Sequence, residues 1–162
     1  MLTRLTPSGK GLITSLLMIA TALGFYYSDL PPDSPLHYLL YVVYALGILW
    51  TLFGYRRSSS FTGTFGDLFT RGFRCFIIIT LTMVLFTGIF TKMHPEFAEE
   101  TAKAYREELM KKNEKTPPEI ESEVASIKKQ YMIRIVSRSI FGYLIVGAGI
   151  TAVLSALLTR RK

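Results

Sequence analysis

Residues 139–159 read SIFGYLIVGAGITAVLSALLT, a run of 21 residues without an Asp, Glu, Lys or Arg. A bilayer core about 30 Å thick requires roughly 20 apolar residues at about 1.5 Å of rise per residue, so this run is long enough to cross a membrane as a helix. Three more charge-free runs of similar length precede it in the chain. We therefore expect four membrane spans, at about 11–28, 35–55, 74–91 and 139–159.

These spans define the fold class. In lipid, every backbone polar group must be hydrogen-bonded within the protein, so we expect the spans to be helices, because a β-barrel would show shorter segments of alternating hydrophobicity. The spans take up so much of the 162 residues that too few remain for a separate globular domain. The sequence predicts a single membrane domain over 1–162, an all-α integral membrane four-helix bundle.

The net charge of +7 depends on Lys and Arg residues, many of which flank the predicted spans. Such cations orient a membrane protein and attract anionic headgroups, so we expect the lipid bilayer, and no nucleic acid, as the partner of this charge. Segments 1–10, 56–74 and 160–162 all hold Lys or Arg, whereas the loop between the first two spans holds none, which predicts that both termini are cytoplasmic. Arg134 and Arg138, beside the fourth span, oppose this orientation.

The N-terminal segment allows a second interpretation. Arg4 and Lys10, an apolar run and then Ala-Thr-Ala at 20–22 also describe a signal peptide with a small-residue cleavage site. The apolar run continues past this site to Tyr27, as expected for a span that ends in an interfacial aromatic belt. We favour a retained membrane span.

Residues 58–73 are too polar to span a membrane, yet a Phe recurs every four residues from Phe61 to Phe73. This spacing places the four rings on one helical face. We expect an amphipathic helix in the cytoplasmic interface that turns into the third span at Gly72. A glycine-weakened loop whose rings touch the headgroups is the alternative.

Residues 95–138, between the third and fourth spans, predict an extramembrane helical hairpin. The first arm begins at Pro95 and has its acids early and its bases late, as the helix dipole favours. The second arm begins with the capping-box pattern TPPE at 116–119 and meets no proline or glycine before Phe141, so we expect it to run unbroken into the fourth span. The apolar positions of each arm form one stripe: Phe97, Ala98, Ala102, Tyr105 and Leu109 in the first arm, and Ile120, Val124, Ile127, Tyr131 and Ile135 in the second. The stripe of the second arm must be covered by the first arm or by a second copy of the protein. The candidate partner surface comprises Tyr105, Glu108, Ile120, Val124 and Ile127.

The fourth span also carries small residues at helical spacing. Small residues on one face let helices approach closely in lipid, where apolar surface alone does not drive association. This predicted helix-packing face, which could meet the same chain or another protein, comprises Gly147, Ala148, Thr151, Ala152, Ser155 and Ala156.

No group of residues typical of catalysis or cofactor binding is visible in the sequence. His37 and His94 are expected at the same outer surface, but their spacing matches no zinc motif. Cys75 is the only cysteine, so no intramolecular disulfide can form, and we expect a buried or lipid-facing thiol. The hairpin Glu residues alternate with Lys, as on solvated helical faces. We expect no enzyme activity, no cofactor and no metal site.

Short motifs along the chain match a known family in their order and spacing. They are GLIT at 11–14, FGYR at 53–56, SF at 60–61, FGD at 65–67, RGF at 71–73, HPEF at 94–97, YREE at 105–108 and FG at 141–142. The chain resembles, over nearly its whole length, the family of small bacterial membrane proteins catalogued as domain of unknown function 4199. The resemblance implies four spans, an interfacial segment before the third span and a charged excursion opened by Pro-Glu, but no activity, cofactor or catalytic residue. This chain departs from the family in having no glycine in the turn at 113–118.

Together these features favour a non-enzymatic accessory or scaffold subunit of the bacterial inner membrane that engages another membrane or envelope protein, or a second copy of itself. The alternative is a small transporter or channel component that acts as an oligomer. Its pathway would use small and hydroxyl-bearing residues of the third and fourth spans, namely Thr80, Thr82, Thr87, Gly88, Gly147 and Gly149.

Overall fold

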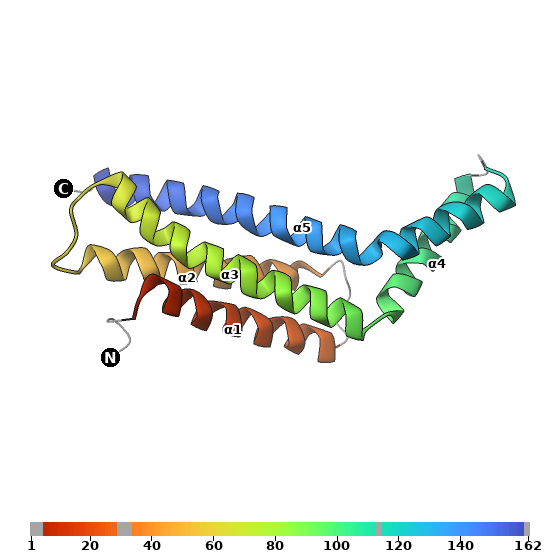
Figure 1. The fold of residues 1–162 in the computed structure, drawn as a ribbon, viewed down its shortest axis with the longest axis horizontal. Helices are drawn as coiled ribbons and strands as arrows, with labels where there is room; N and C mark the ends of the chain where they lie inside the picture. The colour runs from red at the N-terminus through yellow and green to blue at the C-terminus, as the bar shows by residue number, and fades with distance from the viewer. Residues whose placement is uncertain (1–4, 29–33, 113–114, 161–162) are drawn as a thin grey trace. The chain divides into compact units, whose positions relative to one another are not determined.

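The computed structural model describes residues 5–28, 34–112 and 115–160. Its helices are α1 (Pro7–Tyr27), the short 3-10 helix η2 (Pro35–His37), α2 (Tyr38–Arg56), α3 (Phe65–Met93), α4 (Glu96–Lys112) and α5 (Pro117–Arg160) (Figure 1). The described residues contain no β-strand, and the all-α prediction is confirmed. Four helical segments are long and apolar enough to cross a membrane: Pro7–Tyr27, Pro35–Arg56, Phe65–Met93 and Pro117–Thr159.

The chain divides into two compact units, so that α3 and α5 each contribute to both. The first unit comprises Met1–Met83 and Ile140–Lys162, and the second comprises Val84–Ser139. The first unit is a four-helix bundle, in which α1 begins and α5 ends at the same end (Figure 1). The two ends coincide because α1, α2, α3 and the part of α5 in this unit run alternately in opposite directions along the bundle.

The core of the bundle is centred on α2. Tyr44, Ile48 and Leu52 of α2 are fully buried, as are Met18 of α1 and Ile79 of α3. Large apolar side chains on the opposite helical faces are exposed, and in a membrane-spanning bundle these faces are the ones that contact lipid. They include Leu12, Leu16 and Leu17 of α1, Leu39, Val42 and Leu46 of α2, Leu81 of α3, and Phe141, Ile145, Val153 and Leu157 of α5.

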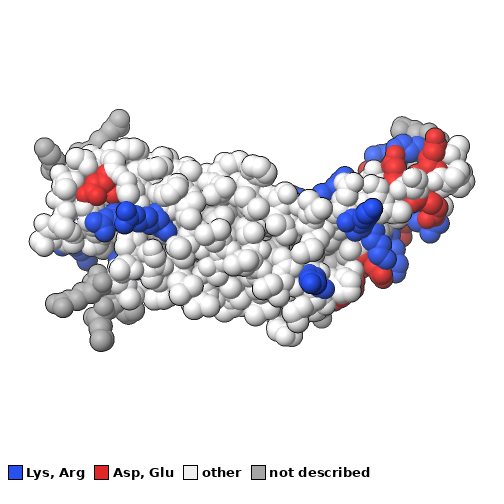
Figure 2. Space-filling view, in the orientation of Figure 1, with Lys and Arg blue, Asp and Glu red and all other residues white. Residues whose placement is uncertain are grey.

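The charged side chains that the structure describes in the first unit lie at one end of the bundle. Figure 2 shows Lys and Arg, with a small acidic patch, at the end where α2 finishes and α3 begins, and none over the middle of the bundle on the face shown. Transfer of an unpaired charge into the hydrocarbon region is costly, so this distribution suits a bundle whose middle lies in lipid.

Small residues allow the bundle helices to approach closely. A Cβ added at Gly11 of α1 would lie 2.7 Å from the carbonyl oxygen of Cys75 in α3. A Cβ added at Gly47 of α2 would overlap the side chain of Thr14 in α1. The α1–α2 and α1–α3 contacts therefore depend on the absence of a side chain at these two glycines.

The segment before the third span differs from the prediction. Instead of an interfacial helix over 58–73, residues 57–60 form turns and a bend and residues 61–64 have no regular structure. Helix α3 starts at Phe65 and passes through Gly72 without a turn. The chain turns at Gly63, whose φ of +79° suits glycine, and the Thr64 hydroxyl then accepts a 3.3 Å hydrogen bond from the Asp67 amide. Gly72 is a packing residue, because a Cβ there would overlap Thr151 of α5.

The four phenylalanine rings are correspondingly divided. Phe65, Phe69 and Phe73 follow one another along α3, with ring centroids 5.8 and 6.4 Å apart. Phe61 lies in the preceding turn and packs edge-on against Tyr55, at 5.8 Å. The predicted stripe is therefore helical from Phe65 onwards, and the loop alternative applies to the residues before it.

The second unit contains α4, the end of α3 and the first part of α5. As expected, α5 runs from Pro117 to Arg160 without a break. Its start is capped by Glu119, whose carboxylate accepts hydrogen bonds from the Thr116 amide at 2.8 Å and from the Thr116 hydroxyl at 2.7 Å. One of the two bonds of the predicted capping box is thus present, the bond from the Thr116 amide to the Glu119 carboxylate. The Thr116 hydroxyl donates to Glu119 as well, instead of accepting a hydrogen bond from the Glu119 amide. Residues 113 and 114 of the predicted turn lie outside the described residues.

Candidate functional site

The hairpin of the second unit is closed by a thin apolar seam, formed by Ala102 and Leu109 of α4 and Ile120 of α5. Each of these side chains is no more than 7% exposed. In the sequence they belong to the two amphipathic stripes, so the arms cover one another. The hairpin seam therefore gives each arm the partner that its apolar stripe requires.

Ion pairs join the two arms along one side of the hairpin seam. Lys128 Nζ of α5 lies 2.8 Å from Glu99 Oε1 of α4, and Arg106 of α4 pairs with Glu121 of α5. The hydrogen bond and charge of Lys128 lower the pKa of Glu99 below its ordinary value. Exposed pairs contribute little stability individually, but they specify which faces of the two helices meet.

The predicted partner surface is split by this packing. Ile120 lies in the hairpin seam, Val124 and Ile127 are half-buried, and the Tyr105 hydroxyl is 3.5 Å from Glu123 Oε2 of α5. Glu108 is exposed, and its pKa is lowered by the hydrogen bond and charge of Lys112, whose Nζ is 2.6 Å away. The apolar members of the surface thus contact the hairpin itself, and the charged member remains on the outside.

Outward charges of α4 remain available to another molecule. Glu100 and Glu107 are exposed, and neither forms an ion pair with any residue that the structure describes. Figure 2 shows that Lys and Arg alternate with acidic residues, all of them Glu, over the surface of the hairpin. A partner would therefore meet a surface of mixed charge rather than an apolar groove.

The small-residue face of α5 is turned into the bundle of the first unit along one of its two rows. Gly147, Thr151 and Ser155 are buried. A Cβ added at Gly147 would overlap the Tyr44 hydroxyl of α2 and lie 2.9 Å from the Phe76 ring of α3. The second row is half-buried and consists of Ala148, Ala152 and Ala156. The row with the tightest contacts thus packs within the chain.

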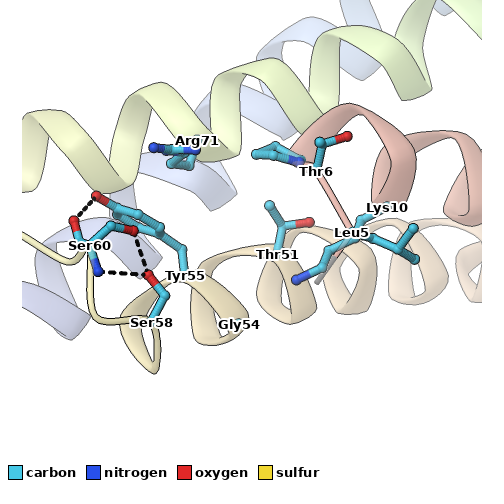
Figure 3. Close-up of a pocket in the computed structure, with 10 residues that line it drawn as sticks. Leu5, Thr6, Lys10, Thr51, Gly54, Tyr55, Ser58, Ser60 and Arg71 are labelled. Carbon is cyan, nitrogen blue, oxygen red and sulfur yellow. Dashed lines mark hydrogen bonds between the residues drawn. The ribbon is translucent and has the colours of Figure 1, made fainter. Parts of the chain in front are cut away.

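A cavity of about 370 Å³ lies at the charged end of the bundle, and we call it the basic pocket (Figure 3). The first turn of α1, the last turns of α2, the turn at residues 58–60 and Arg71 of α3 form its wall. The hydroxyls of Thr6, Ser58 and Ser60 and the ammonium of Lys10 contribute polar groups. Leu5 and Pro7 add apolar surface. The pocket is therefore cationic, rich in hydroxyl groups and partly apolar.

One side of the basic pocket is held by a network around Tyr55. The Tyr55 hydroxyl lies against the Asp67 carboxylate. It also lies 2.9 Å from the Ser60 carbonyl oxygen (Figure 3). The guanidinium of Arg71 lies 4.5 Å from the centre of the Tyr55 ring. Thr62 also donates to Asp67, at 3.0 Å. Asp67 is thus engaged by its own neighbours, and these contacts fix the turn that closes the pocket.

The other side is formed by Lys10, a residue whose role the sequence analysis missed. Lys10 is only 3% exposed, its Nζ lies 5.2 Å above the Trp50 ring, and its side chain extends towards Gly54 of α2 (Figure 3). Trp50 and Gly54 are four residues apart on one face of α2, with room for a long side chain. In the sequence, this spacing of an aromatic residue and a glycine on α2 is the feature that could have indicated a site for the Lys10 side chain.

The fold and these surfaces define an all-α membrane four-helix bundle with a charged helical hairpin. The chain belongs to the family described as "Protein of unknown function (DUF4199)", whose model matches residues 10–161. The resemblance inferred from the short motifs is thereby confirmed. No curated protein and no solved structure matches the chain.

Proposed function

We propose that this protein is a non-enzymatic accessory or scaffold subunit of the bacterial inner membrane, and that its charged hairpin engages another membrane or envelope protein. The observation that carries the proposal is the self-contained hairpin. Its arms cover each other's apolar stripes and pair across the hairpin seam, while Glu100 and Glu107 face outward without an ion pair among the described residues.

A hairpin with these properties is suited to recognition. Because both arms are already helical, association with a partner would not have to order them, and this lowers the entropic cost of binding. Exposed charges of both signs select a partner with the complementary pattern and repel others. The proposal therefore assigns affinity and selectivity to the hairpin, and membrane anchoring to the bundle.

The proposed orientation has both termini in the cytoplasm and the hairpin on the opposite side of the membrane. The charged end of the bundle supports it, since Asp67 is the only acid among the described residues of the first unit. The cations described there are Lys10, Arg56, Arg57, Arg71 and Arg74. An excess of cations marks the cytoplasmic side of short segments. A cysteine introduced at Glu107, in a Cys75→Ser background, should react with a membrane-impermeant maleimide in intact spheroplasts, and protection there would contradict this orientation.

Photocrosslinking in living cells tests the partner. A photoreactive amino acid is placed separately at Glu100 and Glu107, and at Leu16 on the exposed face of α1 as a matched control. Both hairpin positions should capture the same protein, and Leu16 should not. Absence of a protein adduct at both hairpin positions, or equal capture from Leu16, would contradict the proposal.

The transporter alternative makes a different demand on the bundle. It requires Thr80 and Gly147 to line a hydrated pathway, but both are buried in the first unit, and the contacts of Gly147 are with Tyr44 and Phe76. An oligomer would have to expose these residues again before they could contact water. For this reason we favour the accessory role, and an ion- or solute-flux assay on the purified protein in liposomes tests the alternative.

A further inference from the structure

The basic pocket contains a buried lysine, Lys10, for which the described part of the chain provides no anionic partner. Lys10 is 3% exposed, and no carboxylate among the described residues forms an ion pair with its ammonium group. The Trp50 ring, at 5.2 Å, offers a cation–π contact. Such a contact offsets only part of the cost of removing an ammonium group from water, and buried charges are normally paired. An anion bound beside Lys10 would supply the counter-charge that the described residues do not provide.

The groups around Lys10 specify the chemistry of that counter-ion. Arg71 and the hydroxyls of Thr6, Ser58 and Ser60 line the same cavity. The Ser58 and Ser60 hydroxyls are hydrogen-bonded to each other at 2.7 Å, so Arg71, Thr6 and one of the two serines are the donors left for a ligand. Asp67, the acid that the described residues place nearby, does not line the cavity and is engaged by Tyr55 and Thr62. The N-terminus of α1, at Pro7, adds the positive end of a helix dipole. The pocket is thus suited to a compact oxyanion with several acceptor oxygens.

The position of the pocket indicates where this anion comes from. It lies at the charged end of the bundle, next to the apolar runs of α1 and α2, and Leu5 and Pro7 give it an apolar margin. A volume of about 370 Å³ is within the range of small-ligand sites and exceeds what a lone inorganic ion needs. We propose that the basic pocket binds the phosphate group of an anionic phospholipid headgroup, with the ammonium of Lys10 as its charge partner.

The test uses the purified full-length chain in detergent and its single cysteine as a probe. Cys75 is fully buried, so a thiol reagent labels it only when the bundle opens. Phosphatidylglycerol is titrated in and compared with phosphatidylcholine of the same acyl chains and with soluble glycerol phosphate. A ligand that binds only the closed state at 100 times its Kd lowers the opening equilibrium, and with it the labelling rate, about 100-fold.

The variants are Lys10→Met, which keeps an unbranched side chain without its charge, and Arg57→Gln as the matched control. Arg57 is exposed at the same end of the bundle and does not line the pocket, so both variants remove one positive charge. We expect phosphatidylglycerol to slow labelling of the wild type and of Arg57→Gln more than phosphatidylcholine does, and Lys10→Met to lose this difference. Lys10→Gln provides a second variant if Lys10→Met does not fold.

Three results would overturn the proposal. Equal protection by the two lipids would show that no anionic headgroup is recognised. If Lys10→Met and Arg57→Gln both lost the extra protection by phosphatidylglycerol to the same extent, the effect would be a general attraction between charges and not recognition by Lys10. Equal protection by glycerol phosphate without lipid would make the ligand a soluble phosphate ester rather than a phospholipid.

Discussion

Substitution of Gly147 by Ala probes whether the small-residue face of α5 serves the chain itself. The added Cβ would overlap the Tyr44 hydroxyl and lie 2.9 Å from the Phe76 ring. Tyr44 is fully buried, and its hydroxyl donates a 3.0 Å hydrogen bond to the Tyr143 carbonyl oxygen, so it cannot move aside without losing that bond. Gly149 is the matched control, because a Cβ there meets nothing within 4 Å.

The expected cost follows from three contributions. Overpacking of a well-packed core costs about 1–3 kcal/mol. Loss of the Tyr44 hydrogen bond adds about 1 kcal/mol. Replacement of a helical glycine by alanine returns about 1 kcal/mol through helix propensity. We therefore expect Gly147→Ala to lower the free energy of unfolding by about 1–3 kcal/mol, and Gly149→Ala to leave it unchanged or to raise it slightly.

The assay is again the labelling rate of Cys75, whose buried side chain lies 3.2 Å from the Thr51 hydroxyl. A loss of about 1–3 kcal/mol corresponds to labelling about 5- to 150-fold faster than in the wild type. The Tyr44→Phe/Gly147→Ala double variant should recover part of this loss, because it removes the nearest clashing atom. Equal labelling rates for Gly147→Ala and Gly149→Ala would refute the packing argument. The small-residue face of α5 would then again be a candidate surface for another protein.

The remaining predictions concern the hairpin. Leu109→Ala should cost about 2–5 kcal/mol in local stability and speed amide hydrogen exchange in α4, whereas Met110→Ala, on the exposed side, should have little effect. Lys128→Glu should also speed this exchange, because it places like charges at positions 99 and 128. The charge swap Glu99→Lys/Lys128→Glu should restore the wild-type exchange rate, whereas a double variant whose effect is the sum of the two single effects would contradict the pairing. The folded-state pKa values of Glu99 and Glu108 are lowered, so their stabilisation is present above the ordinary value of 4.5 and is lost as pH falls through the lower folded values. Exchange in α4, corrected for its intrinsic rate, should therefore rise below about pH 4.5, and less so in Lys128→Gln.

Features that depend on composition and local pattern could be predicted from the sequence. A charge-free apolar run of about 17 to 25 residues has few alternatives to a membrane-spanning helix, which is why the spans were found. The absence of proline and glycine from Glu119 to Phe141 predicted a continuous α5, and the apolar stripes predicted that Ala102 and Leu109 would be buried.

Features that depend on which helices meet could not be predicted in this way. Gly72 was expected to mark the turn into the third span, but it lies inside α3. The glycine serves packing instead, because Thr151 occupies the space that a side chain at this position would need. Phe61 fitted the four-residue period of the stripe, but the positive φ of Gly63 separates it from the helix. Lys10 resembled an ordinary flanking cation until α2 placed Trp50 beside it.

The mass of the complex extracted from native membranes tests the central claim most directly. The tagged full-length chain is extracted from the membranes with a mild detergent, and the mass of the intact complex is measured for the wild type and for the Glu100→Lys/Glu107→Lys variant. Both positions are exposed, so the variant should fold normally, which its Cys75 labelling rate would verify. We predict a complex of the wild type with one other membrane or envelope protein, and its loss in the variant. A wild-type chain that is only monomeric, or a complex that the variant retains unchanged, would contradict the account.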